Sequence, residues 1–213
     1  MTTVHQSEQT PRDIIAAGRL LPVVVLRDVA GAIPLADALI DGGLRAIEVT
    51  FRTAAAVGAI RAVADKLLVG AGTVLTVDQV DQAVDAGARF IVTPGFGPAV
   101  VRRCQDLGVP VFPGVATATE IQMALDAGLT TVKFFPAEQL GGAPMIKALS
   151  APFPMVRFIP TGGINADNLD DYQALPAVLA VGGTWMVAPH LLEDGSWAEV
   201  TRLTRRALGG FGA

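Results

Sequence analysis

The stretch 126-DAGLTTVKFF-135 joins the end of a predicted helix to a predicted buried strand. Gly128 suits the left-handed conformation that ends many helices, and the run after it is apolar on both faces, as strands of parallel sheets are. The segments 41-DGG-43 and 85-DAG-87 repeat the pattern, each at a helix end before a strand. The three aspartates are 44 and 41 residues apart, about two β-α units, so the repeat marks alternate strands of one parallel sheet.

Short β-branched runs alternate with alanine-rich stretches of helical periodicity on both sides of this segment. The predicted strands are Leu21–Leu26, Arg45–Phe51, Leu67–Ala71, Arg89–Thr93, Val109–Gly114, Thr131–Phe135, Val156–Pro160 and Val178–Val181. The predicted helices between them are Ile33–Asp41, Ala55–Ala64, Val77–Ala86, Pro98–Leu107, Ala118–Ala127 and Ala143–Leu149. This unbroken alternation favours an α/β fold of the (β/α)₈ TIM barrel type, although a doubly wound open sheet has the same local pattern.

Two further features belong to this fold prediction. Gln9–Arg19 has the pattern of a short amphipathic helix, and we expect this extra N-terminal helix to cover the open bottom of the barrel. Because no linker or low-complexity segment divides the chain, residues 1–213 are predicted to form a single domain.

The composition bounds the class of protein. The 213 residues are 51% hydrophobic and 17% charged, which is typical of a packed globular protein. The net charge of −4 argues against a nucleic-acid partner, which would require a basic face. No apolar run reaches the ~18 residues of a membrane span, and Met1–Arg12 lacks the apolar core of a secretory signal. We therefore expect a cytoplasmic protein with neither a membrane nor a nucleic acid as partner.

Few side chains suit histidine or thiolate chemistry. The single cysteine, Cys104, excludes an intramolecular disulfide and a thiolate-rich metal site, and it is predicted to be a buried apolar side chain of a helix. His5 and His190 lie outside the predicted strands. Three of the 16 basic residues are lysines, and one of these, Lys133, lies inside an apolar strand.

The repeat also aligns the register of the strands. The residues seven positions after the three aspartates are Glu48, Val92 and Lys133, and equivalent positions on alternate barrel strands tend to point inward in one layer. Glu48 and Lys133 are therefore predicted to face a shared interior near the C-terminal ends of the strands, where barrel enzymes carry their active sites. Packing does not explain them, because a buried charge is costly unless it is paired or used.

Two interpretations of this pair stay open at the level of spacing and burial. Burial disfavours the ammonium form of a lysine, and a neutral Lys133 could form a Schiff base with a carbonyl substrate while Glu48 transfers protons. Alternatively, Glu48 is the structural counter-ion of Lys133, or Lys133 extends outward to solvent.

Groups that suit an anionic substrate follow several strands. Arg52, four residues after Glu48, is a candidate clamp for a carboxylate or phosphate, with a surface salt bridge as the alternative. The glycine-bearing segments 70-GAGT-73, 160-PTGG-163 and 182-GGTW-185 are predicted as loops after strands. Loops after the last two strands of a barrel often bind phosphate through backbone amides. Glu138 could serve the site, but its loop position is more typical of a solvated carboxylate.

Six motifs in this order resemble the 2-keto-3-deoxy-6-phosphogluconate (KDPG) aldolases, from about Leu21 to Trp185. The motifs are 48-EVTFRT-53, 70-GAGT-73, 93-TPG-95, 133-KFFPAE-138, 160-PTGG-163 and 182-GGTW-185. The resemblance implies a class I aldolase on a (β/α)₈ barrel, usually a homotrimer, in the Entner–Doudoroff pathway. It implies cleavage of the phosphorylated keto-deoxy sugar acid 2-dehydro-3-deoxy-6-phosphogluconate to pyruvate and glyceraldehyde 3-phosphate. Family members often also cleave 4-hydroxy-2-oxoglutarate, to pyruvate and glyoxylate.

The resemblance also implies roles for single residues. Lys133 would be the Schiff-base lysine and Glu48 the general acid/base, and with an iminium as electron sink neither a metal nor a cofactor is expected. The other implied assignments are Arg52, Thr73 and Thr161 for the substrate carboxylate, Gly162, Gly163, Gly183 and Thr184 for the phosphate, and Pro94 and Phe135 for the pocket wall. Thr93 and Thr184 stand where the family often has serine, and the extra methyl of Thr184 bears on phosphate affinity.

Three other functions remain open beside this one. An aldolase for the galactonate epimer of the substrate resembles the chain in fold, but that group typically lacks the forms 134-FFPAE-138 and 161-TGG-163. A phosphosugar isomerase or epimerase shares the barrel, but its metal-dependent members need inward histidines. A non-catalytic phosphosugar-binding barrel would leave the inward lysine and glutamate unexplained.

Overall fold

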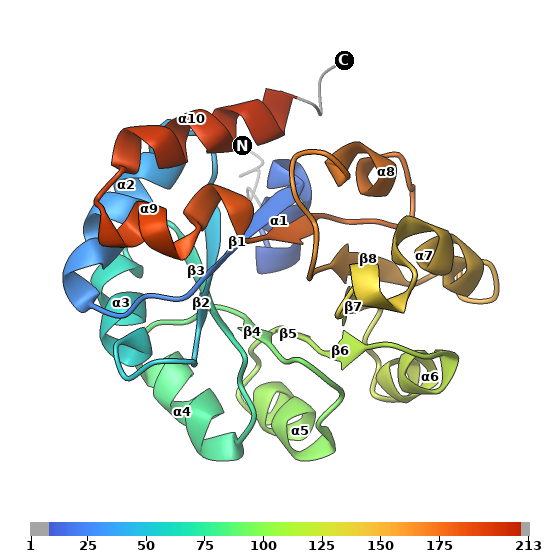
Figure 1. Cartoon of the computed structure of the whole chain (residues 1–213). Helices are drawn as coiled ribbons and strands as arrows, with labels where there is room; N and C mark the ends of the chain where they lie inside the picture. Colours follow the sequence, from blue (N-terminus) through green and yellow to red (C-terminus); the bar gives the residue numbers. More distant parts are fainter. Residues whose placement is uncertain (1–8, 210–213) are drawn as a thin grey trace, which may run out of the picture.

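Parallel strands curl into a closed barrel that is surrounded by helices in the computed structural model, which describes residues 9–209 (Figure 1). Within this range, six strands are bonded in the order β5-β4-β3-β2-β1-β9 and three in the order β6-β7-β8. Parallel bridges between Phe158 and Val178 and between Thr161 and Gly182 join β8 to β9. In the chain, Pro113 alone separates β5 from β6. The predicted TIM barrel is confirmed, and the open-sheet alternative is wrong.

The elements follow the predicted alternation. The strands are β1 (Leu20–Val24), β2 (Ala46–Thr50), β3 (Leu68–Gly72), β4 (Ile91–Val92), β5 (Val111–Phe112), β6 (Gly114–Val115), β7 (Thr131–Phe134), β8 (Arg157–Pro160) and β9 (Val181–Gly183). The α-helices are α1 (Pro11–Gly18), α2 (Ala32–Asp41), α3 (Ala56–Val63), α4 (Val77–Asp85), α5 (Pro98–Asp106), α6 (Ala118–Asp126), α7 (Gly142–Ser150), α8 (Leu169–Gln173), α9 (Pro189–Glu193) and α10 (Trp197–Gly209). Short 3-10 helices lie at η1 (Val29–Gly31), η2 (Glu138–Leu140) and η3 (Trp185–Val187). None of the helices in the described range is long and apolar enough to cross a membrane.

Three details differ from the sequence prediction. The fifth strand is split at Pro113, because proline has no N–H to donate to a ladder. The last strand begins at Val181, later than predicted, because Val181 to Gly183 pair with β1 while Val178 forms a single bridge. Helices α8, α9 and α10 were not predicted. The first two have five residues each, too few to give a clear helical period.

The repeated helix ends have the predicted backbone conformation. Helices α2, α4 and α6 end at the aspartate of each repeat, and Gly43, Gly87 and Gly128 follow with φ of 102°, 100° and 75°. Residues with a Cβ rarely adopt this conformation. Glycine therefore allows the chain to leave each helix and enter the next strand.

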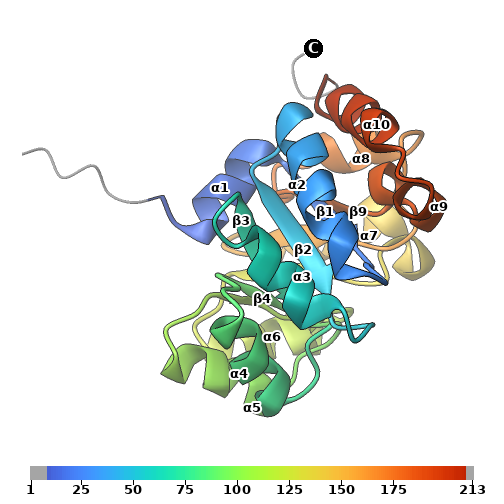
Figure 2. The ribbon, with the colours of Figure 1, turned by 90° about the vertical axis from the view of Figure 1, so that its left-hand side faces the viewer.

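Two apolar clusters lie on the two faces of the barrel wall. The larger one fills the layer between strands and helices. The smaller one fills the barrel interior, with Leu21, Phe90, Val92 and Phe112 among its members, and it includes the fully buried Ile15 of α1. Helix α1 lies at one end of the barrel (Figure 2), and its contribution of Ile15 to the interior confirms that it covers this end.

Candidate active site

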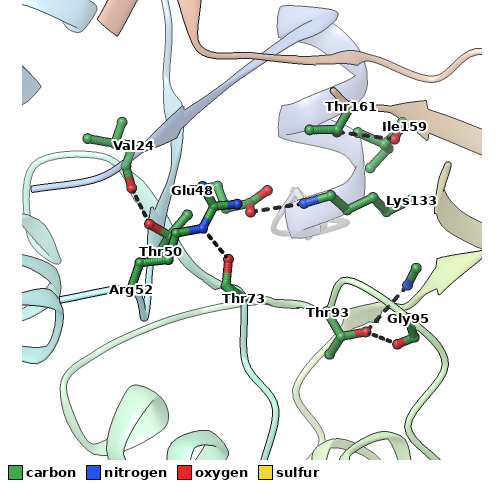
Figure 3. Close-up of polar contacts among 11 residues, drawn as sticks. Val24, Glu48, Thr50, Arg52, Thr73, Thr93, Gly95, Lys133, Ile159 and Thr161 are labelled. Carbon is green, nitrogen blue, oxygen red and sulfur yellow. Dashed lines mark hydrogen bonds and ion pairs between the residues drawn. The ribbon is translucent and has the colours of Figure 1, made fainter. Parts of the chain in front are cut away.

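Glu48 and Lys133 point toward each other across the barrel interior (Figure 3). The distance from Lys133 Nζ to Glu48 Oε1 is 3.3 Å, and the two side chains are 4% and 1% exposed. Val92, the third residue of the predicted layer, belongs to the interior cluster. The strand register therefore places all three residues where the sequence repeat predicts them. The outward, solvent-exposed alternative for Lys133 is wrong.

Each charged residue sits in the middle of a paired strand. Glu48 lies between Val23 of β1 and Gly70 of β3, and Lys133 lies between Gly114 of β6 and Ile159 of β8. Ladder hydrogen bonds on both sides fix the backbone at these positions, so the two side chains approach each other from rigid supports.

Gly72 makes room for the carboxylate of Glu48. A Cβ at position 72 would lie 2.1 Å from Glu48 Oε1, a distance that no side chain could occupy. Gly70 and Gly72 belong to β3, so the strand, predicted to end at Ala71, extends to Gly72, and only Thr73 of 70-GAGT-73 lies in the loop after it. The alternation of inward positions along β2 and β3 was the signal that could have assigned this role to Gly72.

The surroundings of Lys133 are largely apolar. Its Nζ lies 5.3 Å from the centroid of the Phe135 ring. Ile159, the residue that pairs with Lys133 on β8, belongs to the interior cluster. Because the side chain of Lys133 is 4% exposed, its amine has little contact with solvent. The amine contacts the Glu48 carboxylate and could add to the carbonyl of a substrate that enters the barrel. The pair can add the amine to a carbonyl and move protons to and from the adduct.

Arg52 and Thr73 meet at the C-terminal ends of β2 and β3. Arg52 Nε donates to Thr73 Oγ1 at 3.3 Å (Figure 3). Thr73 has a φ of 55°, an uncommon conformation for a residue with a β-branched side chain. Within residues 9–209 Arg52 forms no ion pair, so the surface salt bridge interpretation is wrong for this range. An exposed, unpaired guanidinium beside a hydroxyl can bind a carboxylate.

A glycine turn follows Thr161 at the end of β8. Gly162 and Gly163 have φ of 103° and 79°, and the N–H groups of both find no acceptor in the described part of the chain. Thr161 is buried, and a Cβ at Gly182 would lie 2.1 Å from its Oγ1. Gly182, which belongs to a motif predicted as a phosphate-binding loop, therefore makes room for Thr161.

The neighbouring segment 182-GGTW-185 differs from the prediction. Gly182 and Gly183 are the last residues of β9 rather than loop residues, and Thr184 is the first residue after the strand and is exposed. A Cβ at Gly183 would lie 2.0 Å from the Trp185 ring. Close packing of Trp185 thus explains the glycine at position 183. Of the proposed phosphate-site residues Gly183 and Thr184, only Thr184 has a side chain, and it lies at the end of the strand.

The segment Thr93-Pro94-Gly95 follows β4 and contacts Gly114, the first residue of β6. Thr93 is buried, and its Oγ1 donates to Gly95 O at 2.7 Å and accepts from Gly114 N at 3.3 Å (Figure 3). A Cβ at Gly114 would lie 2.1 Å from Pro94 O. The hydroxyl of Thr93 therefore holds the loop that carries the half-buried Pro94.

Cys104 and Glu138 lie in α5 and η2, outside the residues described above. Cys104 is fully buried in α5, as predicted, and this burial raises the pKa of its thiol to about 11. Glu138 is exposed, but it is not merely a solvated carboxylate, because the buried Tyr172 donates a hydrogen bond to it. His5 lies outside the described residues, and in residues 9–209 no group of three His, Cys, Asp or Glu side chains could hold a metal ion.

The family model for KDPG and KHG aldolases matches residues 12–203. The chain is 54% identical to a 2-dehydro-3-deoxy-phosphogluconate aldolase of Treponema pallidum, over 89% of this chain and 92% of that protein. It is 42% identical to a KHG/KDPG aldolase of Escherichia coli, over 92% and 94% of the two chains. A solved KDPG aldolase from Legionella pneumophila, which holds pyruvate as a covalent carbinolamine intermediate, is similar with a TM-score of 0.90 and 40% identity over 93% of this chain and 98% of that chain. The chain therefore belongs to the KDPG and KHG aldolase family, as its motifs predict.

Proposed function

We propose that this protein is a class I aldolase that cleaves 2-dehydro-3-deoxy-6-phosphogluconate to pyruvate and glyceraldehyde 3-phosphate. The observation that carries the proposal is the buried Lys133–Glu48 pair, 3.3 Å apart inside the barrel. Relatives at 54% and 42% identity bear the names of this activity.

The reaction begins with the amine of Lys133. The neutral Nζ adds to the C2 ketone of the substrate and forms a carbinolamine, and Glu48 is placed to relay the proton from nitrogen to oxygen. Loss of water then gives a protonated Schiff base, the iminium. A relative with pyruvate bound as a carbinolamine supports this route.

Bond cleavage follows from the iminium. Glu48, directly or through a water, removes the proton of the C4 hydroxyl, the C3–C4 bond breaks, and its electron pair moves toward the iminium nitrogen. Glyceraldehyde 3-phosphate leaves, and an enamine remains on Lys133. Protonation of the enamine at C3 and hydrolysis release pyruvate and restore the amine.

The anionic ends of the substrate would bind at the strand ends. Arg52 and Thr73, which are hydrogen-bonded to each other, would hold the pyruvyl carboxylate together with Thr161. The proposed phosphate ligands are the N–H groups of Gly162 and Gly163 and the hydroxyl of Thr184. The N–H of Gly183, which the motif also suggested, is committed to the ladder between β9 and β1. Pro94 and Phe135 would line the pocket between the two anionic sites.

Trapping of the Schiff base tests the proposal. The protein is incubated with pyruvate, reduced with borohydride, digested and mapped by mass spectrometry. We expect the adduct on Lys133. The absence of an adduct, or an adduct on Lys66 or Lys147 in its place, would disprove the assignment.

Substrate scope is a separate question. Cleavage of 4-hydroxy-2-oxoglutarate is a proposed second activity, which the name of the Escherichia coli relative supports. Rates on the gluconate and galactonate epimers should be compared, because their difference lies at C4, where Glu48 is proposed to act. Faster cleavage of the galactonate epimer would favour the alternative aldolase.

We also propose a single-domain chain that forms a homotrimer in the cytoplasm. The continuous barrel and the family resemblance support these statements. One cooperative unfolding transition would support the single domain. Sedimentation equilibrium should give three times the 22.0 kDa of the chain, and fractionation of the source cells should place the protein with cytoplasmic markers.

A further inference from the structure

We propose that Glu138 and Tyr172 form a positioning pair that holds the Gly162–Gly163 turn in the conformation that binds the substrate phosphate. The inference rests on the function proposed above, in which this turn is a phosphate site. It gives a role to a buried tyrosine and a motif glutamate that the aldol chemistry does not use.

The backbone of Glu138 aims the amide of Gly163. Glu138 N–H donates to Gly162 O at 3.1 Å. Because the peptide bond is trans and planar, the carbonyl of residue 162 and the N–H of residue 163 point in opposite directions. The bond from Glu138 therefore directs Gly163 N–H away from Glu138, and this N–H has no acceptor within the described chain.

The side chain of Glu138 supports the same turn. A Cβ at Gly163 would lie 2.6 Å from Glu138 Cβ, so the stem of Glu138 packs directly against the backbone of Gly163. Asn168 Nδ2 holds the carbonyl of Gly163 from the other side, at 3.3 Å. The turn is thus held by its carbonyls and leaves its N–H groups free for an anion.

Tyr172 holds the carboxylate of Glu138 in place. Its hydroxyl donates to Glu138 Oε1, and the residue is 1% exposed in α8. Helix α8 ends the segment that begins at Gly162, and it lies beside α7 (Figure 1). Burial, followed by the hydrogen bond to Glu138, raises the pKa of Tyr172 far above its usual value of 10, so the hydroxyl remains a donor at neutral pH.

This geometry predicts an effect that is specific to phosphate. Without the Tyr172 hydroxyl, the Glu138 carboxylate loses its hydrogen-bond donor, and the Glu138 stem that packs against the backbone of Gly163 is no longer held in one rotamer. The turn would then be less well preorganised for the phosphate, because its N–H groups would no longer be held in one orientation. Lys133 and Glu48 are held by the ladders on both sides of β7 and β2, so their chemistry should be unaffected.

The variant Tyr172→Phe keeps the buried ring and removes the hydroxyl. We expect kcat/KM for 2-dehydro-3-deoxy-6-phosphogluconate to fall about tenfold, the size of one lost hydrogen bond to a charged group, with the change in KM rather than kcat. The inhibition constant of inorganic phosphate should rise in parallel. The pyruvate concentration that half-saturates borohydride trapping at Lys133 should not change.

Three variants serve as controls. Glu138→Gln keeps the stem and an acceptor for Tyr172, so its KM should be no higher than that of the wild type, whereas Glu138→Ala should resemble Tyr172→Phe. Asp171→Asn removes an exposed carboxylate one residue from Tyr172 that has no hydrogen bond in the described range, and it should change nothing. Thermal unfolding checks that each variant is folded.

The outcomes separate this inference from the proposed function. Equal losses in phosphate-dependent and pyruvate-dependent readouts, or no loss for Tyr172→Phe, would overturn the positioning role. If the wild type traps no pyruvate, the proposed function fails. Direct calorimetric titration with inorganic phosphate then still decides the pair: weaker binding to Tyr172→Phe supports it, and equal or absent binding overturns it.

Discussion

At the scale of single residues, Glu48 and Lys133 depend on each other. Both are almost fully buried, and a buried charge that loses its partner destabilises a protein by several kcal/mol, roughly 3–5. The ion-pair and catalytic interpretations are therefore compatible, because the same 3.3 Å contact neutralises the pair at rest and provides the path for a proton during reaction.

The variant Glu48→Gln tests the proton-transfer role. Its amide cannot accept a proton, so we expect kcat to fall roughly 10²–10⁴-fold while some pyruvate is still trapped on Lys133. Steady-state cleavage assays measure the first quantity and borohydride trapping the second. Glu193→Gln changes an exposed glutamate and should retain full activity. Wild-type turnover in Glu48→Gln would rule out the role.

The Cys104 thiol links stability to alkaline pH. Its pKa is raised by burial from an ordinary value of 9.0 to about 11, so the unfolded chain loses this proton first. The contribution is complete below pH 9 and is lost as the pH rises toward 11, by about 2 kcal/mol. Urea unfolding at several pH values should show a shallower alkaline decline for Cys104→Ala. An identical decline in both proteins would contradict this assignment.

At the scale of elements, glycines near the C-terminal ends of the strands leave space for the side chains and backbone of other residues. A Cβ at an inward glycine of β3, β6 or β9 would lie within 2.2 Å of another group. The groups that take this space include the Glu48 carboxylate and the Thr161 hydroxyl. Motif glycines that resemble phosphate loops in the sequence therefore serve partly as sites of close packing.

The variant Gly72→Ala tests this packing role. The new methyl group would collide with Glu48 Oε1, so we expect a loss of 1–3 kcal/mol in stability, about the usual cost of overpacking, and a large loss of turnover. Gly18→Ala, where the added Cβ meets its nearest neighbour at 3.5 Å, should change neither. Chemical denaturation and cleavage assays report the two effects. A fully active Gly72→Ala enzyme would be inconsistent with the geometry.

Helix α1 should contribute to stability rather than to catalysis. Ile15 is fully buried in the barrel interior, so Ile15→Ala should cost about 2–5 kcal/mol. The covered end of the barrel lies opposite the strand ends that carry Arg52 and Thr73, so turnover of the folded variant should remain near that of the wild type. Ile33→Ala, at a position that is 45% exposed, is the matched control. Equal stability of the two variants would argue against α1 as a cover of the core.

At the scale of the whole molecule, the barrel separates stability from chemistry. Its N-terminal end is closed by α1, and the interior cluster rises from there to the layer of Glu48 and Lys133. The polar groups of the candidate site follow the C-terminal ends of β2, β3, β8 and β9, which is the usual place for active sites in this fold.

Removal of divalent metal ions tests the proposed Schiff-base mechanism. The proposed reaction uses the iminium as its electron sink, so turnover should not require a divalent ion. We expect dialysis against EDTA to leave kcat and KM unchanged, with a known metal-dependent aldolase as the positive control. Loss of activity that added Zn²⁺ restores would contradict the Schiff-base route.

The alternation of strands and helices, the repeat that ends three helices and the inward register of Glu48 and Lys133 were all readable from the sequence, because they follow from local periodicity and from glycine's backbone freedom. The membership of Gly72 and Gly183 in strands and the contact between Tyr172 and Glu138 were not. They depend on which atoms meet when distant strands close into a barrel. Such contacts join residues far apart in the chain, and local patterns carry no information about those distances.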